Sequence, residues 1–359
     1  MQIKRKTNFE NFKVAKKLSP EALIKKVEKS GLMGRGGANF PTGLKWKMSR
    51  PAKYLICNAD ESEPGRFKDK FVLDNNPEIV IEGINIAMYA LSTKQCFFYL
   101  REEFKKYKEK LEKIIKEKSK YKITIVIGAG SYICGEETAI LNSIEGKRAE
   151  TRHKPPYPSE RGLYDEKTCV NNIETLARIP LIFEDDFDNE LTLFSVSGDV
   201  QSPGVYEERQ GITLKYLAEK VGAIDPYAIF FGASGGCIPF QQDLILSYKE
   251  MEKTGNFFQT GIMFFNNEKS VPDICRSIIQ FFNEENCGKC LPCREGNFRL
   301  LQLFQVILKR KWTKEEFQII QDLIDFVPNG SQCGLGKSST IALKSAIKYF
   351  KNEFDKLIE

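Results

Sequence analysis

Four of the ten cysteines in this 359-residue chain stand in a pattern that can bind a metal cluster. Cys287, Cys290 and Cys293 are each separated by two residues, and Cys333 follows 40 residues after the third. This three-plus-one spacing supplies four thiolates, which is the usual ligand set of a [4Fe–4S] cluster. Structural zinc is the alternative, but zinc sites more often use two separated ligand pairs or histidines. The spacing therefore favours a [4Fe–4S] cluster.

The segment 34–46 is a candidate for binding phosphate. Its first half carries few side chains, because it contains Gly34, Gly36 and Gly37. A bare loop lets backbone N–H groups close on an anion, and Arg35 and Lys45 bracket this one with positive charge. The segment lacks the G-x-x-x-x-G-K-[ST] pattern and the preceding strand of a dinucleotide motif. A plain turn is the alternative interpretation of the glycines.

A carboxylate-rich loop follows the strand expected at 54–57. Asn58 opens it, and Asp60, Glu61 and Glu63 then place three carboxylates within four residues. Like charges at that spacing cost stability. The loop is either an acidic solvated segment or part of a site that uses its carboxylates.

A second glycine-containing segment, 128–138, follows the β-branched run expected as a buried strand at 123–127. It contains Tyr132, Gly135, Glu136 and Glu137 and opens a helix. Backbone N–H groups at such a helix start bind anions or polar ligands. The ordinary preference of Glu for a first helical turn is the alternative, and it explains Glu136 better than Glu137.

Two further segments carry side chains suited to a nucleotide. Lys154-Pro155-Pro156-Tyr157-Pro158 is stiff and projects an aromatic ring. Asn171 and Asn172, followed by Thr175, place two adjacent amides before an apolar helix. Such amides cap helices for structural reasons, and they also suit the hydrogen-bonding edge of a heterocycle.

Composition excludes several other classes of function. The 54 basic and 48 acidic residues interleave along the chain, which indicates a solvated surface without a nucleic-acid-binding stripe. The single histidine, His153, argues against Ser-His-Asp, Cys-His and multi-histidine metal chemistry. No apolar run reaches the length of a membrane helix, and the basic N-terminus is not followed by the apolar core of a signal peptide. We therefore expect a cytoplasmic protein whose cysteines are not in disulfides.

Hydrophobic patterning predicts three regions. Strands and helices alternate up to about residue 180, with strands at 54–57, 95–100 and 123–127 and helices at 19–29, 79–91 and 102–118. This alternation is typical of an α/β fold. Alternating residues around a Pro-Gly turn then predict a small β-grasp-like module over 190–265. Helices follow at 272–285, 296–309, 313–326 and 337–357, with Phe298, Leu301, Phe304 and Leu308 expected as one buried stripe.

The cysteine pattern and the phosphate loop together point to a second cofactor. An iron–sulfur cluster moves one electron at a time, and the α/β region offers no general base. A flavin accepts two electrons and releases them singly, so a flavin is the cofactor that would join these two sites.

With these residues in view, the chain resembles the flavoprotein subunit of NADH dehydrogenases, which include respiratory complex I. Diaphorase subunits of NAD-linked hydrogenases and formate dehydrogenases belong to the same family. The resemblance rests on segments 34–46, 58–65, 128–138, 154–158, 171–175 and 287–296 together with Cys333. It implies an α/β FMN- and NADH-binding domain at 1–188, a β-grasp domain at 189–268 and a helical [4Fe–4S] domain at 269–359.

The resemblance also implies residue roles. The expected FMN contacts are Gly34, Arg35, Gly36, Gly37, Lys45, Asn58, Asp60, Glu61, Gly135, Glu136, Asn171, Asn172 and Thr175. The expected NADH contacts are Phe40, Lys45, Glu63, Tyr132, Glu137 and Tyr157, with Phe40 and Tyr157 stacking on adenine. No catalytic acid or base is expected, because hydride transfer to a flavin depends on stacking geometry. Asn39 stands where the family usually has glycine, and we expect it to tolerate the positive φ of the loop.

The resemblance further implies partners and a location. Electrons would pass from the [4Fe–4S] cluster to a small thioredoxin-like [2Fe–2S] subunit and further iron–sulfur subunits, ultimately to quinone. The chain would bind no nucleic acid and would not insert into a membrane, although partner subunits could hold it at the inner face of the plasma membrane. Two alternatives stay open: a diaphorase subunit of a soluble hydrogenase or formate dehydrogenase, and a non-catalytic iron–sulfur scaffold. A polysaccharide- or nucleic-acid-binding protein is a third, which the mixed charge disfavours.

Overall fold

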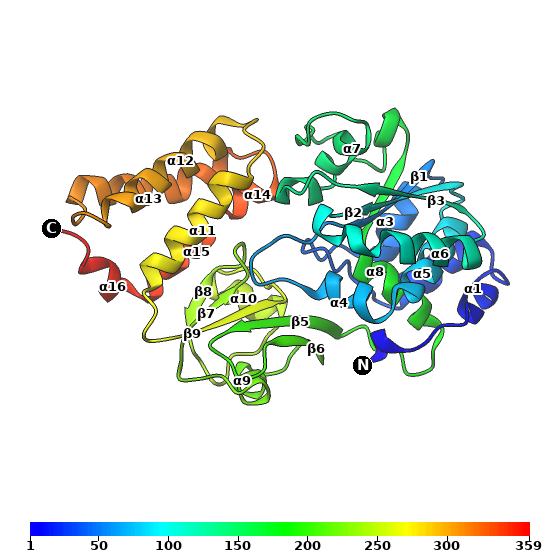
Figure 1. Ribbon diagram of the computed structural model, residues 1–359, viewed down its shortest axis with the longest axis horizontal. Helices are drawn as coiled ribbons and strands as arrows, with labels where there is room; N and C mark the ends of the chain where they lie inside the picture. Colours follow the sequence, from blue (N-terminus) through cyan, green and yellow to red (C-terminus); the bar gives the residue numbers. More distant parts are fainter. The chain divides into compact units, whose positions relative to one another are not determined.

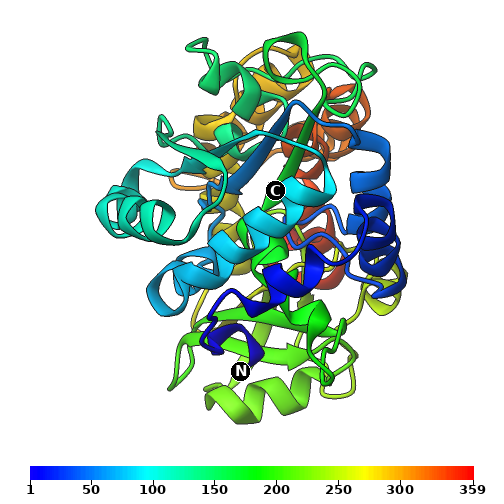
Figure 2. The ribbon, with the colours of Figure 1, turned by 90° about the vertical axis from the view of Figure 1, so that its right-hand side faces the viewer.

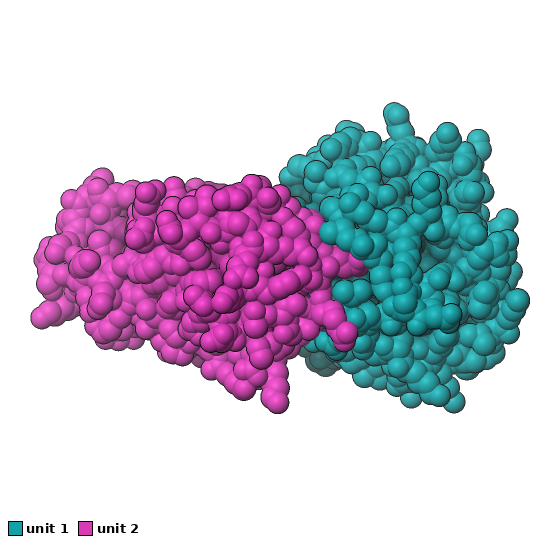
Figure 3. Space-filling view, turned by 90° about the horizontal axis from the view of Figure 1, so that it is seen from below, with its two compact units in different colours: residues 1–62, 67–192 teal, residues 63–66, 193–359 magenta.

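The computed structural model describes residues 1–359 and divides them into two compact units. Unit 1 comprises residues 1–62 and 67–192, and unit 2 comprises residues 63–66 and 193–359 (Figure 3). None of the helices in residues 1–359 is both long and apolar enough to cross a membrane.

Unit 1 is built on a four-stranded parallel sheet in the order β3-β2-β1-β4. The strands are β1 (Tyr54–Ala59), β2 (Gln95–Leu100), β3 (Lys122–Ile127) and β4 (Thr168–Asn172). In this register Leu55 of β1 lies opposite Cys96 of β2 and Cys169 of β4. The parallel pairing confirms the α/β class expected from the alternation of strands and helices.

Alternate strand residues point to opposite sides of a sheet. Helices cover both sides of this one. On one side α5 (Pro77–Ala90) packs against β1 and β2, as Figures 1 and 2 show. The Asn76 side chain caps α5 by accepting from the Ile79 N–H at 3.2 Å, and Pro77 suits the first helical position. On the other side α7 (Ala139–Ile144) packs Ile140 on strand residues that include Ile56.

Shorter helices complete unit 1. They are α1 (Glu10–Ala15), α2 (Pro20–Lys29), α3 (Thr42–Ser49), α4 (Lys68–Asn75), α6 (Lys108–Lys118) and α8 (Ile173–Arg178). Five 3₁₀ helices lie at Gln2–Lys4, Glu102–Tyr107, Tyr132–Gly135, Leu163–Asp165 and Pro180–Phe183. The charged helix expected at 102–118 is thus a 3₁₀ turn followed by α6.

The strand order has a switch point between β1 and β4. From β1 the chain adds β2 and then β3 on one side, and it later adds β4 on the other side. In open parallel sheets ligands bind at such a point, outside the carboxyl ends of the strands. We therefore expect a ligand-binding site at the residues that end β1 and β4.

Unit 2 contains a mixed sheet in the order β6-β5-β9-β7-β8. The strands are β5 (Leu191–Gly198), β6 (Gly204–Arg209), β7 (Pro226–Phe231), β8 (Cys237–Pro239) and β9 (Gly261–Asn266). Strand β9 pairs parallel with β5 and antiparallel with β7. A buried core joins the sheet to α9 (Leu214–Val221) and to Met251 of α10 (Tyr248–Thr254). The β-grasp topology and the three-domain boundaries stay predictions.

The rest of unit 2 is helical. Its helices are α11 (Val271–Glu285), α12 (Leu291–Val306), α13 (Lys314–Gly330), α14 (Gly334–Ser338), α15 (Ile341–Tyr349) and α16 (Lys351–Asp355) (Figure 1). The helix expected at 337–357 is three shorter helices. Of the stripe expected here, Phe304 is buried as predicted. The prediction is wrong for Phe298, which is exposed on α12, and for Leu308, which is exposed beyond the end of that helix.

Candidate functional site

Polar side chains from β1 and β4 gather at the switch point of the parallel sheet. The Asn58 side chain at the end of β1 donates to the Gly135 carbonyl at 2.9 Å and accepts from the Asp60 N–H at 3.0 Å. Asn171 at the end of β4 accepts from the indole N–H of Trp46 at 2.9 Å. Four separate segments of the sequence, 34–46, 58–65, 128–138 and 171–175, therefore meet here.

The glycine loop closes against the end of β4. The Arg35 N–H donates to the Thr175 hydroxyl at 2.8 Å, and the Gly34 N–H donates to the Phe40 carbonyl at 2.9 Å. A Cβ at Gly36 would stand only 3.3 Å from the Asn172 Cβ, so a side chain here would crowd β4. Asn39 adopts a φ of +48°, which confirms that this asparagine tolerates the left-handed conformation.

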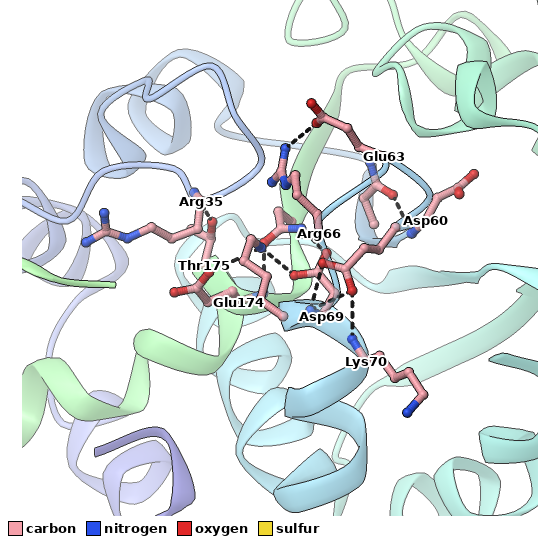
Figure 4. A network of polar contacts seen from close by, with 12 residues as sticks. Arg35, Asp60, Glu63, Arg66, Asp69, Lys70, Glu174 and Thr175 are labelled. Carbon is pink, nitrogen blue, oxygen red and sulfur yellow. Dashed lines mark hydrogen bonds and ion pairs between the residues drawn. The ribbon is translucent and has the colours of Figure 1, made fainter. Parts of the chain in front are cut away.

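The Arg35 side chain is buried and is held within unit 1. Its guanidinium donates to the Asn189 carbonyl at 2.6 Å and to the Leu191 carbonyl at 3.1 Å. In Figure 4 this side chain extends away from Asp69 and Lys70. The contacts give Arg35 a structural role, and its expected contact with phosphate stays a prediction.

Lys45 is the other cation that brackets the loop. Its ammonium donates to the Val170 carbonyl at 3.2 Å and lies 6.0 Å from the centre of the Phe40 ring. Phe40 is 38% exposed, so part of an aromatic side chain is accessible beside this cation. The arrangement keeps Lys45 available to an anion next to the glycine loop.

Asp60 is the strongest sign of a missing polar partner. One of its oxygens, Oδ1, lies 3.2 Å from Arg101, while the buried Oδ2 has no hydrogen-bond partner anywhere in residues 1–359. Burial raises the pKa of Asp60 to about 7, although Arg101 acts in the opposite direction. A buried carboxylate oxygen without a donor is costly, so a ligand that donates a hydrogen bond would be stabilised here.

A buried network of charges lies beneath the switch point (Figure 4). Lys68 bridges Asp69 at 2.5 Å and Glu174 at 3.2 Å, and Glu174 also pairs with Arg178 at 2.9 Å. Burial alone would raise the pKa of Glu174, but Lys68, Arg178 and Arg35 hold it at about 2. The other Asp69 oxygen accepts from the Asn172 amide at 2.6 Å, so the network fixes how that amide is turned.

Glu61 and Asn172 both serve as helix caps. Glu61 accepts from the backbone N–H groups of Asp69 and Lys70 at 2.9–3.0 Å, at the start of α4. Burial and the neighbouring Asp69 raise the pKa of Glu61 to about 7. Asn172 accepts from the Glu174 N–H at 2.9 Å and so caps α8. The structural alternative considered for the Asn172 amide is confirmed, and direct contacts of these two side chains with FMN stay predictions.

Lys154 joins the two carboxylates that follow Gly135. Its ammonium lies 2.9 Å from Glu136 and 2.9 Å from Glu137. Burial lowers the pKa of Lys154, but both carboxylates raise it more strongly, so the ammonium stays charged. Glu136 also accepts from the Thr138 and Ala139 N–H groups at the start of α7. Glu137 makes no such cap and is the freer of the two to meet a ligand.

The remaining expected nucleotide contacts lie in different surroundings. Tyr132 is half-buried in its 3₁₀ helix, and Tyr157 is 50% exposed. Glu63 belongs to unit 2, where it is buried and accepts from the Ser234 N–H at 3.0 Å and pairs with Arg66 at 2.9 Å. These contacts give Glu63 a structural role in its unit, and its contact with NADH stays a prediction.

A cavity of about 560 Å³ lies next to the proline-rich segment of unit 1. It is lined by Asn142, Glu145, Lys147, Arg152, His153, Pro156, Arg161, Tyr164 and Asp165. None of the site residues expected from the sequence lines this cavity. Its three cations are paired with Glu145 or Asp165.

The four patterned cysteines, Cys287, Cys290, Cys293 and Cys333, lie in unit 2. They are placed at the starts of two helices and in the loop before the first of these. Cys290 is the N-cap of α12 and Cys333 is the N-cap of α14. Burial and the neighbouring Cys290, Cys333 and Cys287 raise the pKa of the Cys293 thiol to about 12. No group of three or more His, Cys, Asp or Glu side chains in residues 1–359 is arranged around a single metal ion. That finding does not bear on a four-iron cluster, in which each cysteine binds a different iron.

Two glycines shape the surroundings of the patterned cysteines. Gly288 adopts a φ of +75°, and Arg294 donates to the Gly288 carbonyl at 2.8 Å, which holds the loop over the start of α12. Gly336 passes so near Cys293 that a Cβ there would stand 3.1 Å from the Cys293 Cβ. Four thiols and no histidine form the donor set of an iron–sulfur cluster, so the residues fit that group.

The residues of unit 1 likewise fit a flavin mononucleotide. The unpartnered oxygen of Asp60 needs a hydrogen-bond donor, and the ribityl hydroxyls of FMN are donors. Gly36 and Gly135 lie where a side chain would crowd Asn172 or Asp60, as expected where backbone must approach a ligand closely.

Sequence reasoning missed several residues of this site. The buried polar side chains that orient Asn172 belong to Lys68, Asp69 and Glu174. Two cations pair with expected contact residues: Arg101 with Asp60 and Lys154 with Glu136. The one available signal was the i,i+4 pair of Glu174 and Arg178 inside an otherwise apolar helix. Lys68 and Asp69 are adjacent in the chain, but their pairings with Glu174 and Asn172 join distant segments, which no local pattern reveals.

Fold and site together define an α/β flavin-binding protein that also carries an iron–sulfur region. The model of the Nuo51 FMN-binding domain matches residues 27–181. The model of the NADH-ubiquinone oxidoreductase-F iron–sulfur binding region matches residues 273–357. The chain belongs to the family of NADH dehydrogenase flavoprotein subunits that these two models describe.

Curated relatives and solved structures agree with this assignment. The F subunit of the NADH-quinone oxidoreductase of Streptomyces coelicolor is 36% identical, over 99% of this chain and 87% of the relative. The corresponding protein of Buchnera aphidicola is 34% identical, over 99% of this chain and 89% of the relative. The alpha subunit of the NAD-reducing hydrogenase HoxS of Cupriavidus necator is 37% identical, over 93% of this chain and 60% of the relative.

A solved NAD⁺-reducing [NiFe]-hydrogenase in its H2-reduced state contains a chain with the same fold. The TM-score is 0.92 at 31% sequence identity, covering 99% of this chain and 66% of that one. This chain therefore spans about two thirds of the solved hydrogenase chain. The mixed α/β architecture with a second sheet and helices is thereby confirmed.

Proposed function

We propose that this chain is the flavoprotein subunit that oxidises NADH in a multi-subunit oxidoreductase and passes single electrons to a partner subunit. The observation that carries the proposal is the presence, in one chain, of a flavin-type site at the β1–β4 switch point and a three-plus-one cysteine site. The FMN-domain and iron–sulfur matches support it, as do the relatives that are F subunits of NADH-quinone oxidoreductases.

Bound FMN would take a hydride from NADH and release the two electrons singly. The protein's own part is to bind and orient. Gly34, Gly36 and Gly37 let the backbone approach the phosphate, and Lys45 offsets its charge. The buried Asp60 oxygen accepts a hydrogen bond from a ribityl hydroxyl. Asp69 holds the Asn172 amide in one orientation.

Apart from Glu63, which belongs to unit 2, the proposed NADH contacts belong to unit 1. The exposed rings of Phe40 and Tyr157 offer stacking surfaces for adenine. Glu137 accepts hydrogen bonds from the ribose hydroxyls, while Lys154 holds its carboxylate in place. No side chain needs to move a proton for a hydride to transfer.

The finer organisation belongs to the same proposal. Residues 1–188 form the FMN- and NADH-binding domain, residues 189–268 a β-grasp domain and residues 269–359 the helical domain. In the last, Cys287, Cys290, Cys293 and Cys333 hold the [4Fe–4S] cluster. The acceptor is a small thioredoxin-like [2Fe–2S] subunit, and further iron–sulfur subunits carry the electrons ultimately to quinone. Such an assembly would work in the cytoplasm, at the inner face of the plasma membrane.

A second candidate function is the diaphorase subunit of a soluble NAD-linked hydrogenase or formate dehydrogenase. The observations that favour it are the 37% identity to the HoxS alpha subunit and the hydrogenase chain of the same fold. Both candidates share the FMN and cluster sites, so they differ only in what accepts the electrons.

The test is purification of the chain with its native partners under anaerobic conditions. We expect the purified protein to contain a [4Fe–4S] cluster and to release FMN on denaturation. We also expect it to reduce ferricyanide with NADH. Quinone reduction would favour the first candidate, and hydrogen- or formate-dependent NAD⁺ reduction would favour the second. A preparation that contains FAD, or a cluster without any flavin, would contradict the proposal and favour a non-catalytic scaffold.

A further inference from the structure

A fully buried asparagine lies one helical turn after the cysteine Cys293. Asn297 of α12 is 0% exposed. Its Nδ2 donates to the Cys293 carbonyl at 2.8 Å and lies 3.5 Å from the Cys293 Sγ. Its Oδ1 is buried and has no hydrogen-bond partner within residues 1–359.

The orientation of this amide follows from its surroundings. If the amide were turned over, Oδ1 would face the Cys293 carbonyl oxygen, and two acceptors would repel one another. Nδ2 therefore faces Cys293, and its two hydrogens can serve the carbonyl and the sulfur separately.

The carbonyl contact alone does not explain a buried asparagine here. Within an α-helix the carbonyl of residue 293 already accepts from the backbone N–H of residue 297. The unpaired Oδ1 also has a desolvation cost that an apolar side chain of similar size would avoid. The partner that only the side chain can serve is the sulfur of Cys293.

We propose that Asn297 donates an N–H···S hydrogen bond to the cluster ligand Cys293 and thereby raises the reduction potential of the [4Fe–4S] cluster. This inference rests on the proposed function, in which Cys293 binds that cluster. When the cluster accepts one electron, no bond breaks and its total charge becomes more negative by one. An N–H donor at a ligand sulfur stabilises the more negative state more strongly, which favours reduction.

The consequence concerns the direction of electron flow. A higher cluster potential makes transfer of electrons from the flavin to the cluster more favourable. Asn297 therefore favours the step in which an electron passes from the flavin to the cluster.

Two substitutions separate the sulfur contact from the carbonyl contact. Asn297→Leu removes both contacts and keeps a similar side-chain volume. Asn297→Thr keeps a donor that bonds the carbonyl four residues earlier, as helical threonines do, but offers nothing to the sulfur. We expect both variants to shift the cluster's reduction equilibrium about tenfold toward the oxidised state, which for one electron is a fall of about 59 mV in potential. The measurement is a redox titration of the complete chain followed by the paramagnetic signal of the reduced cluster.

Asn256 provides a matched control in the same unit. It is also buried with an unpartnered Oδ1, but its Nδ2 donates to the Thr254 hydroxyl at 2.9 Å and to the Cys237 carbonyl. We expect Asn256→Leu to leave the cluster potential unchanged. A potential in Asn297→Thr equal to that of the wild type, or a fall matched by Asn256→Leu, would overturn the inference.

A vibrational measurement keeps the test decisive if Asn297→Leu fails to fold. Exchange into D2O should shift the terminal Fe–S(Cys) stretch of the wild type in resonance Raman spectra and leave that of Asn297→Thr unshifted. Identical exchange behaviour in both proteins would overturn the inference. Absence of any cluster from the wild-type chain would instead refute the proposed function, so the two failures are distinguishable.

Discussion

The buried carboxyl of Asp60 makes the stability of unit 1 depend on pH in a way that can be calculated. Burial raises its pKa from 3.8 to about 7 in the folded chain. The folded state therefore binds more protons than the unfolded state between these values, and stability falls as pH rises through that window. At about 1.4 kcal/mol per pKa unit, the free energy of unfolding should fall by about 2–3 kcal/mol between pH 5 and pH 8 because of this one group.

The perturbation is Asp60→Asn, which keeps the size of the side chain and removes its charge. The free energy of unfolding of the variant should lack this contribution, so the difference between variant and wild type should grow in favour of the variant as pH rises. Glu61, whose pKa is also raised, is present in both proteins and cancels from the difference.

The assay can follow unit 1 alone. The chain has two tryptophans, and Trp46 is buried in unit 1 while Trp312 is buried in unit 2. In a Trp312→Phe background, denaturant unfolding followed by fluorescence reports on unit 1. Asp165→Asn is the control, since Asp165 is exposed beside Arg161 and its pKa is lowered. A difference between Asp60→Asn and wild type that is constant from pH 5 to pH 8 would refute the reasoning.

Three further predictions concern the cofactor sites. Cys333→Ser should abolish the paramagnetic signal of the reduced cluster while FMN stays bound, and an unchanged signal would contradict the ligand assignment. Lys45→Ala should weaken FMN binding by about 1.5–3 kcal/mol in equilibrium titration, the loss of one charge-assisted contact; an unchanged affinity would contradict a phosphate role. Glu137→Gln should raise kcat/KM for NADPH with ferricyanide, because a carboxylate at the ribose repels a 2′-phosphate. The gain should be modest because Lys154, 2.9 Å away, already offsets that charge, and no gain at all would show that Glu137 does not discriminate.

Local patterns predicted the elements that carry the site better than they predicted the roles of its residues. The strand at Gln95–Leu100 and the helix around 79–90 follow from runs of apolar residues, and the sheet is parallel as expected. In α12, by contrast, spacing alone selected Phe298 as buried, although the buried residues lie on the opposite face, and Leu308 lies beyond the end of the helix. An apolar side chain at a surface carries little cost, so sequence cannot tell it from a core residue.

The candidate site shows the same division. The cysteine spacing and the bare glycine loop are visible in the sequence because their chemistry is local. The guanidinium of Arg35, by contrast, contacts the carbonyls of Asn189 and Leu191, more than 150 residues away in the chain. Lys68, Asp69 and Asn172 likewise form their network across distant segments, so only the fold reveals which polar residues support the site.

The most direct test of the account is anaerobic addition of NADH to the purified wild-type chain and to Cys333→Ser, followed by absorbance and paramagnetic resonance. We predict that NADH bleaches the flavin absorbance in both proteins. After further reduction with dithionite, only the wild type should show the signal of a reduced [4Fe–4S] cluster. A bound flavin that NADH leaves oxidised, or a wild-type chain that binds no flavin, would contradict the claim that this chain oxidises NADH.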